Sequence, residues 1–157
     1  MNNAPRVEVV IEVPKGSIVK RRSSGRTDFV SPIPCPFNYG AIDAFIGPDG
    51  DLLDAVVLGP RLRRGTRLTV PVVGAIRISD RGIFDDKIIC SSRPVGSLKR
   101  TLILSFFRFY AKCKGLINFC RGHSGRNFCH GWKDAGEILE RAADRTTGVH
   151  KDSRPSK

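Results

Sequence analysis

Three aspartates lie within one short segment, Asp49-Gly50-Asp51-Leu52-Leu53-Asp54. The glycine permits a tight turn, which would bring two carboxylates of the turn and one of the following strand toward one point. Carboxylates about 4 Å apart repel by about 4 kcal/mol at an effective dielectric near 20, so such a cluster takes up protons or binds cations. Converging oxygens suit a hard divalent cation such as Mg²⁺, although a lone motif of this kind is also common as a solvated turn. An EF-hand is excluded, because its loop would need glycine at Asp54 and glutamate at Pro60.

A second acidic segment, Asp80-Arg81-Gly82-Ile83-Phe84-Asp85-Asp86-Lys87, follows the apolar run Leu68 to Ile78. That run has the length and composition of a strand. Two acidic turns joined by a strand can face the same cavity. The pattern therefore predicts one site lined by both segments, which we expect to open at the mouth of a barrel.

The charge balance of the chain points to anionic partners. Its 157 residues include 27 Lys and Arg against 15 Asp and Glu, for a formal charge of +12. A balance of this kind favours nucleic acid, an acidic membrane surface or a phosphate-rich small molecule, and charge alone does not choose among them. The length and the 40% hydrophobic content predict a single domain with one core.

We expect a cytoplasmic protein without a membrane partner. No apolar stretch approaches the roughly 20 residues of a spanning helix, and the start MNNAPRVEVV lacks the pattern of a secretion signal. The five cysteines are odd in number, so they do not all pair within one chain, and reduced thiols are the expectation.

Short strands dominate the first two thirds of the chain. Val9 and Ile11 alternate with Glu12 in a strand from Val7 to Val13, which places Glu12 on the opposite face. Further strands are expected at Asn38 to Ile46, Leu52 to Leu58, Arg67 to Ile78 and Lys87 to Ser91. Strands of this number and spacing suggest a barrel.

Helices are expected toward the end of the chain. Leu98, Leu102, Ser105, Phe106 and Phe109 recur at three and four residues, which predicts a helix from about Val95 to Lys112 whose apolar face covers the barrel. After an irregular linker over 114–131, we expect a second helix over Trp132 to Arg145. Residues 1–145 would form the single domain, and the polar, basic residues 146–157 would fray.

Four segments together resemble consecutive blocks of the soluble family I inorganic pyrophosphatases. They are VVIEVP (9–14), FNYG (37–40), DGDLLD (49–54) and DRGIFDDK (80–87), with weaker echoes in FFRFYAK (106–112) and Gly131-Trp132. The resemblance implies a mainly β fold, an OB-like antiparallel five-stranded β-barrel with two flanking α-helices. It also implies a homo-oligomer that hydrolyses inorganic pyrophosphate with several Mg²⁺ ions per active site.

By the same resemblance, Asp49, Asp54 and Asp85 would hold the first Mg²⁺, and Asp54 would also reach the second. Asp80 with Asp85 would hold ions that arrive with the substrate, and Asp51 would accept the proton of the attacking water. The metal-binding candidates are thus Asp49, Asp54, Asp80, Asp85 and Glu12. The candidates for contact with substrate phosphates are Lys20, Arg26, Tyr39, Lys87, Tyr110 and Lys112.

Three positions depart from the family pattern. Arg22 stands where the family has an acidic residue, Cys35 replaces a tyrosine, and Ala111 replaces the lysine that follows the tyrosine at Tyr110. Lys112, one position later, is the candidate to compensate. We expect weaker substrate binding with hydrolysis retained, and the alternative is a degenerate paralogue without turnover.

Two further alternatives rest on other residues. The basic stretches Lys20-Arg21-Arg22 and Arg61 to Arg67 could track a nucleic-acid backbone, as in oligonucleotide-binding barrels, although most phenylalanines lie in apolar runs explained by core packing. The other alternative is a zinc site formed by Cys113, Cys120, His123, Cys129 and His130. These residues lack the short paired spacing that is usual for zinc ligands.

Overall fold

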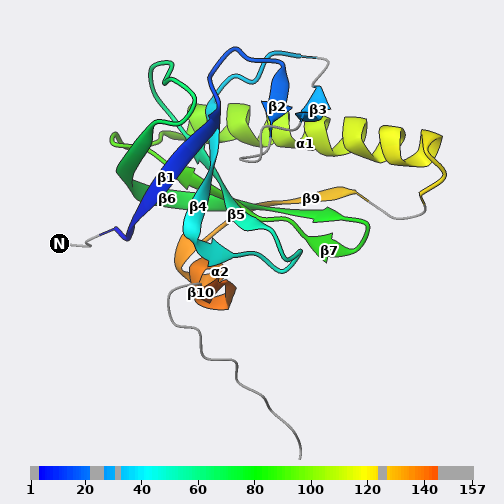
Figure 1. Ribbon diagram of the computed structural model, residues 1–157. Helices are drawn as coiled ribbons and strands as arrows, with labels where there is room; N and C mark the ends of the chain where they lie inside the picture. The colour runs from blue at the N-terminus through cyan, green and yellow to red at the C-terminus, as the bar shows by residue number, and fades with distance from the viewer. Residues whose placement is uncertain (1–3, 22–26, 31–32, 124–126, 145–157) are drawn as a thin grey trace, which may run out of the picture.

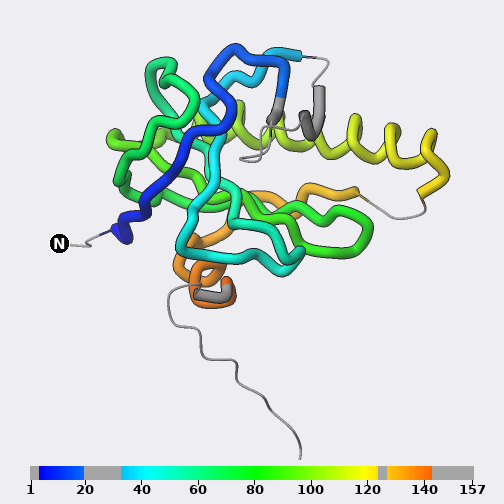
Figure 2. The backbone as a smooth tube through the Cα atoms, in the orientation of Figure 1, coloured from blue at the N-terminus to red at the C-terminus, as the bar shows by residue number. Residues whose placement is uncertain are grey.

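The computed structural model describes residues 4–21, 27–30, 33–123 and 127–144 (Figures 1 and 2). The chain runs through strands into one long helix and ends its described part on a short helix. The elements are β1 (Arg6–Val13), β2 (Val19–Arg21), β3 (Thr27–Val30), β4 (Asn38–Ile46), β5 (Leu52–Val57), β6 (Arg67–Asp80), β7 (Ile83–Phe84), β8 (Lys87–Cys90), α1 (Ser97–Cys120), β9 (Phe128–Lys133), α2 (Ala135–Arg141) and β10 (Ala143–Asp144).

Five strands close into a barrel in the order β1-β4-β5-β8-β6, with β6 returning to pair with β1. This confirms the expected mainly β barrel with two helices. The antiparallel arrangement holds for four of its pairings, but β5 and β8 are parallel. The reason is the long strand β6, which carries the chain back along the barrel, so that β8 enters beside β5 in the same direction (Figure 1).

The inside of the barrel is filled by apolar side chains from all five strands. On β1 the buried residues alternate with exposed or half-buried ones, and Val9 and Ile11 point inward as predicted. Ala55 and Ile88 meet them from β5 and β8. At one end, Ile138 of α2 packs against the same core. This burial drives closure, since each fully buried aliphatic side chain contributes about 1.5–3 kcal/mol.

A second apolar layer lies between the outer wall of the barrel and α1. The helix buries Ile103, Phe107 and Ala111, which pack against residues of β5, β6 and β8 that point outward. The predicted apolar face was wrong, because Leu98 and Leu102 are 75% and 61% exposed. Helix α1 carries apolar residues on two stripes, and periodicity does not tell which stripe faces the barrel.

The end of the chain differs from the expectation in two ways. Helix α1 continues to Cys120 through the segment predicted as a linker, and Trp132 lies in β9, which pairs with β6, instead of beginning a helix. The second helix begins only at Ala135, because Asp134 caps it and accepts hydrogen bonds from the backbone N–H groups of Gly136 and Glu137.

Gly74 of β6 makes room for Trp132. A Cβ atom at this glycine would lie 2.2 Å from the indole ring, far inside van der Waals contact. The same indole packs beneath Arg100 of α1, whose guanidinium carbon is 4.9 Å from the ring centroid. The glycine thus allows β9 to lie against β6 with its large side chain under the helix.

None of the helices in the described ranges is long and apolar enough to cross a membrane. The predicted boundary at residue 145 and the tail 146–157 lie outside the described residues.

Candidate active site

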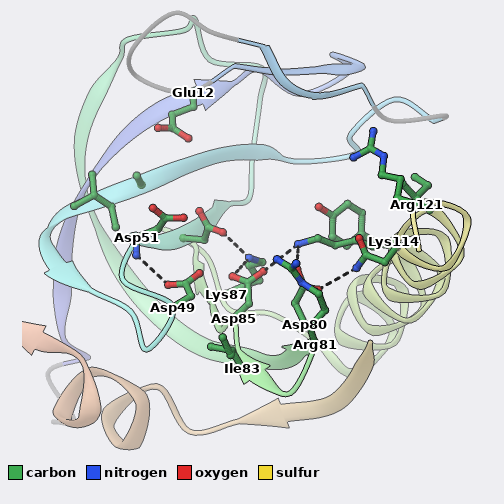
Figure 3. A pocket seen from close by; sticks show the side chains of 16 residues that line it. Glu12, Asp49, Asp51, Asp80, Arg81, Ile83, Asp85, Lys87, Lys114 and Arg121 are labelled. Carbon is green, nitrogen blue, oxygen red and sulfur yellow. Dashed lines mark hydrogen bonds and ion pairs between the residues drawn. The ribbon is translucent and has the colours of Figure 1, made fainter. Parts of the chain in front are cut away.

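A cavity of about 510 Å³ lies on the outer wall of the barrel, beside α1 (Figure 3). Its position follows from strand alternation: Leu53 and Ile88 point into the barrel, so Asp54 and Lys87, their neighbours, point outward. The expectation of a site at the barrel mouth was therefore wrong. Six carboxylates line the cavity, namely Glu12, Asp49, Asp51, Asp54, Asp80 and Asp85.

The turn between β4 and β5 places Asp49 and Asp51 at the cavity. Gly50 has a φ of 85°, a conformation that favours glycine. The backbone N–H of Asp51 donates to Asp49 Oδ1 at 3.2 Å, and the N–H of Gly47 donates to the Asp51 carbonyl at 2.8 Å. These bonds form the tight turn that the sequence pattern indicated.

A second tight turn brings the other acidic segment to the same cavity. Arg81 and Gly82 have φ values of 51° and 82°, so the two residues joining β6 to β7 are both left-handed, as a hairpin turn of type I′ requires. Beyond the hairpin, the N–H of Asp85 donates to the carbonyl of Ile78 at 2.7 Å. Asp80 and Asp85 therefore both line the cavity.

Lys87 is the buried centre of the site. Only 2% of its surface is exposed, and its Nζ lies 2.5 Å from Asp54 Oδ2 and also forms an ion pair with Asp85. Parallel pairing sets Lys87 directly opposite Asp54. Burial disfavours the ammonium, but the charges of Asp54 and Asp85 outweigh it and raise the pKa of Lys87 above its ordinary value. Lys87 is therefore a fixed positive charge.

Tyr39 supports this centre from β4. Its hydroxyl donates to Asp54 Oδ2 at 2.5 Å, and its ring centroid lies 5.8 Å from Lys87 Nζ. Burial, together with the charges of Asp54 and Asp85, raises the pKa of Tyr39 well above its ordinary value. The phenol therefore stays protonated and acts as a hydrogen-bond donor.

Helix α1 contributes Tyr110, as expected, and a lysine that the sequence reasoning missed. Lys114 Nζ lies 2.6 Å from Asp80 Oδ2 and 3.8 Å from Asp85 Oδ2. Lys112, the residue predicted to compensate for Ala111, is exposed and does not line the cavity. The spacing of four residues from Tyr110 to Lys114 is the signal that could have found it, because such residues share one helix face.

Asp86, next to Asp85, belongs to the protein interior. It is 4% exposed and binds Arg77 through both carboxylate oxygens, each at 3.1 Å. The Arg77 guanidinium also lies 4.4 Å from the centroid of the Phe84 ring. This ion pair braces the acidic segment, while Asp85 faces the cavity.

The donor chemistry of the cavity fits Mg²⁺. Its lining offers carboxylates without thiol or imidazole groups, as a hard cation prefers. Burial and the nearby charge of Asp85 raise the pKa of Asp49, a conflict that a cation would relieve. Within the described ranges, no three acidic, His or Cys side chains are gathered closely enough to hold an ion, since lysine ammonium groups lie between the carboxylates.

Some predicted residues lie apart from this cluster or outside the description. Glu12 lines the cavity but stands away from the aspartates (Figure 3). Lys20 lies in β2, and its side chain is not described, while Arg22 and Arg26 lie outside the described residues.

The described residues do not bring the candidate zinc ligands together. All five are free thiols, and the described part of the chain gathers no metal-binding group from Cys113, Cys120, His123, Cys129 and His130. Cys90 lies in the barrel interior, where burial raises its pKa to about 12.

Fold and site together define a small barrel protein whose pocket combines carboxylates with a buried lysine, Lys87, and a half-buried one, Lys114, a lining suited to phosphate and divalent cations. The family model described as inorganic pyrophosphatase matches residues 9–119. The chain belongs to the inorganic pyrophosphatase family.

Curated relatives and solved structures agree with this assignment. An inorganic pyrophosphatase of Corynebacterium efficiens is 34% identical over 53% of this chain and 58% of its own length, and one of Haemophilus influenzae is 35% identical over 54% and 52%. The chain thus spans somewhat more than half the length of these relatives. The crystal structure of inorganic pyrophosphatase from Thermus thermophilus matches with a TM-score of 0.70 and 28% identity, over 89% of each chain.

Proposed function

We propose that this chain hydrolyses inorganic pyrophosphate to two phosphates with Mg²⁺ as its cofactor. The observation that carries the proposal is the meeting of both acidic turns and Lys87 in one cavity, within the residues that match the family. The curated relatives are named inorganic pyrophosphatases, which supports the same reaction.

Mg²⁺ would be held by Asp49, Asp54 and Asp85, with Glu12 as a further candidate, and when bound it would supply a water that ionises near neutral pH. Asp80, the fifth candidate from the resemblance, is paired with Lys114. Asp51 is exposed at the cavity, and its backbone N–H hydrogen-bonds within the turn, which supports the proposal that its carboxylate accepts a proton from that water.

Cationic and hydroxyl groups of the chain would bind the substrate. Lys87 holds a fixed positive charge, and Tyr110 faces the cavity, so both can contact phosphate oxygens. Tyr39 would act through Asp54, because its hydroxyl donates a hydrogen bond to the Asp54 carboxylate. Lys20 and Arg26 remain proposals from the resemblance alone. We assign the phosphate contact that the sequence suggested for Lys112 to Lys114, because Lys114 lines the cavity.

The test is phosphate release from pyrophosphate with and without Mg²⁺, with the double variant Asp49→Asn/Asp54→Asn as control for contaminating activity. Release that needs Mg²⁺ and is absent from the variant supports the proposal. No release from the wild-type chain would contradict it and favour a paralogue that has lost turnover.

We also propose a homo-oligomer in the cytoplasm. The exposed apolar side chains of α1, among them Leu98, Leu116 and Phe119, support association, and five free thiols suit a reducing compartment. Sedimentation velocity at physiological salt would test association, since a single species at 17.3 kDa contradicts it. Cell fractionation would test the compartment.

A further inference from the structure

Asp80 is held differently from the other carboxylates of the cavity. Its Oδ1 accepts hydrogen bonds from the side-chain amides of Asn118 at 3.2 Å and Asn127 at 3.0 Å. Its Oδ2 pairs with Lys114 Nζ at 2.6 Å, and Arg81 Nε lies 3.8 Å from Oδ1. Both oxygens of Asp80 are therefore engaged by nitrogen donors of the protein itself.

These donors compete with a metal ion for the same carboxylate. A carboxylate offers about four lone-pair directions, and three are already used by Lys114 and the two amides. The ammonium of Lys114 also lies 3.8 Å from Asp85 Oδ2, so it stands between the two carboxylates. A positive charge thus already lies where an ion shared by Asp80 and Asp85 would be.

Helix α1 and its C-cap residue Arg121 present polar groups as one continuous face. Tyr110, Lys114, Asn118 and Arg121 follow one another at four, four and three residues, and all four line the cavity. Ala111, at the position of the family lysine, is 2% exposed in the contact between helix and barrel. The chain therefore supplies its helical cation from the next turn, directed at Asp80.

We propose that Lys114 is a substrate-contacting residue whose ammonium, positioned by Asp80, Asn118 and Asn127, binds a substrate phosphate in place of a metal ion at this end of the cavity. Asp80 is then a positioning residue rather than a metal ligand. The proposal rests on the proposed function, because it assigns the end of the cavity that would receive one phosphate of pyrophosphate.

The first experiment counts metal ions. Equilibrium dialysis with Mn²⁺ and imidodiphosphate, an analogue with a nitrogen bridge between its phosphates, gives the number of ions bound per chain. Asp80→Asn should bind as many Mn²⁺ ions as the wild-type chain, whereas Asp54→Asn should bind fewer. Loss of one Mn²⁺ per chain in Asp80→Asn would show that Asp80 is a metal ligand and overturn the proposal.

The second experiment measures the affinity for imidodiphosphate by calorimetry at a fixed Mn²⁺ concentration. Lys114→Met should weaken binding about 10- to 100-fold, as expected for one charge-assisted hydrogen bond, and Lys114→Arg should retain most of the affinity. The matched control is Lys112→Met, an equal change on the exposed side of the same helix. Equal affinities for Lys114→Met and Lys112→Met would overturn the proposal.

Neither experiment requires turnover, so the outcomes separate the two proposals. A wild-type chain that binds imidodiphosphate through Lys114 but releases no phosphate contradicts hydrolysis and keeps the assignment of Lys114. A chain that hydrolyses pyrophosphate with Lys114→Met unimpaired in binding keeps the function and overturns the assignment. Far-UV circular dichroism and the fluorescence of Trp132 verify that each variant is folded.

Discussion

Lys87 and Asp54 lie directly opposite each other on the parallel strands β5 and β8, and their side chains form a buried ion pair of 2.5 Å. The same ammonium pairs with Asp85, so two carboxylates share one lysine in the interior of the site. Their separation from solvent makes the pair sensitive to loss of either partner.

Replacing Lys87 should therefore destabilise the metal-free protein. Lys87→Met removes the ammonium that pairs with both Asp54 and Asp85, and we expect a loss of about 3–5 kcal/mol in the free energy of unfolding. Mg²⁺ should restore more stability to the variant than to the wild-type chain, because the ion no longer competes with the ammonium. Urea unfolding with and without Mg²⁺ measures both effects, with the exposed Lys99→Met as control. An equal Mg²⁺ effect on both proteins would contradict this competition.

Asp85 and Asp86 are adjacent but should respond differently to the same change. Asp86→Asn leaves the buried Arg77 with a neutral partner, so we expect a loss of about 3 kcal/mol in stability. Asp85→Asn should cost little stability, because it removes one of two carboxylates beside Lys87, yet it should impair Mg²⁺ binding. Chemical denaturation and Mg²⁺ titration of the two variants check this division, and equal stabilities would refute it.

Asp51 and Asp54 should separate turnover from metal binding. Asp51→Asn removes the proposed proton acceptor, and we expect kcat to fall about 10²- to 10⁴-fold with Mg²⁺ affinity retained. Asp54→Asn should lower both kcat and the affinity for Mg²⁺. Its carboxylate is a proposed metal ligand, and it also accepts hydrogen bonds from Tyr39 and Lys87. Steady-state kinetics across Mg²⁺ concentrations distinguish these profiles. Identical profiles for the two variants would remove the distinction between base and ligand.

The Asp80–Lys114 pair should contribute a pH-dependent part of the stability. Partial burial opposes the charge on Asp80, but the hydrogen bond and charge of Lys114 outweigh it and lower the pKa of Asp80 below its ordinary value. Its contribution is therefore present above that ordinary value and is lost as the pH falls through the lower, folded-state pKa. Lys114→Met should be less stable by about 1–2 kcal/mol at pH 7, and this difference should vanish on acidification. A difference in unfolding free energy that stays constant from pH 7 to pH 2 would argue against the pair.

Gly74→Ala should disturb the only tryptophan of the chain. The added methyl group would overlap the ring of Trp132, and overpacking of this kind costs about 1–3 kcal/mol. The emission spectrum of Trp132 reports its displacement directly. Gly96→Ala, where a Cβ meets no neighbouring atom within 4 Å, is the matched control. Unchanged emission in Gly74→Ala would show that the contact is looser than described.

Much of the barrel could be predicted from local pattern. The strand Asn38–Ile46 was found with its observed bounds, since turn residues flank a run of strand formers. The two acidic turns could also be predicted, because each contains a glycine, the residue type that most readily adopts the left-handed conformation observed there. The parallel β5–β8 pair could not be found in this way, because it depends on the path of β6 through space.

The side of a helix that faces the protein was the harder question. Helix α1 has apolar residues on both stripes, and only contact with the barrel selects Phe107 over Leu102. Lys114 was missed because the helix was predicted to end at about Lys112, so the residue four positions after Tyr110 fell in the expected linker. The strand β9 was hidden in a segment of mixed polarity, whose pairing with β6 is not local in sequence.

The parallel register of β5 and β8 also limits how the length of the acidic segment can vary. Because neighbouring residues of a strand point to opposite faces, deleting a single residue before β8 would turn Lys87 into the barrel and set Ile88 against Asp54. Lys87 would then take the place of Asp86 beside the Arg77 guanidinium, while Asp54 would lose its counter-ion. Single-residue insertions and deletions between Asp80 and Lys87 should thus be tolerated far less well than amino-acid exchanges at the exposed Ile83.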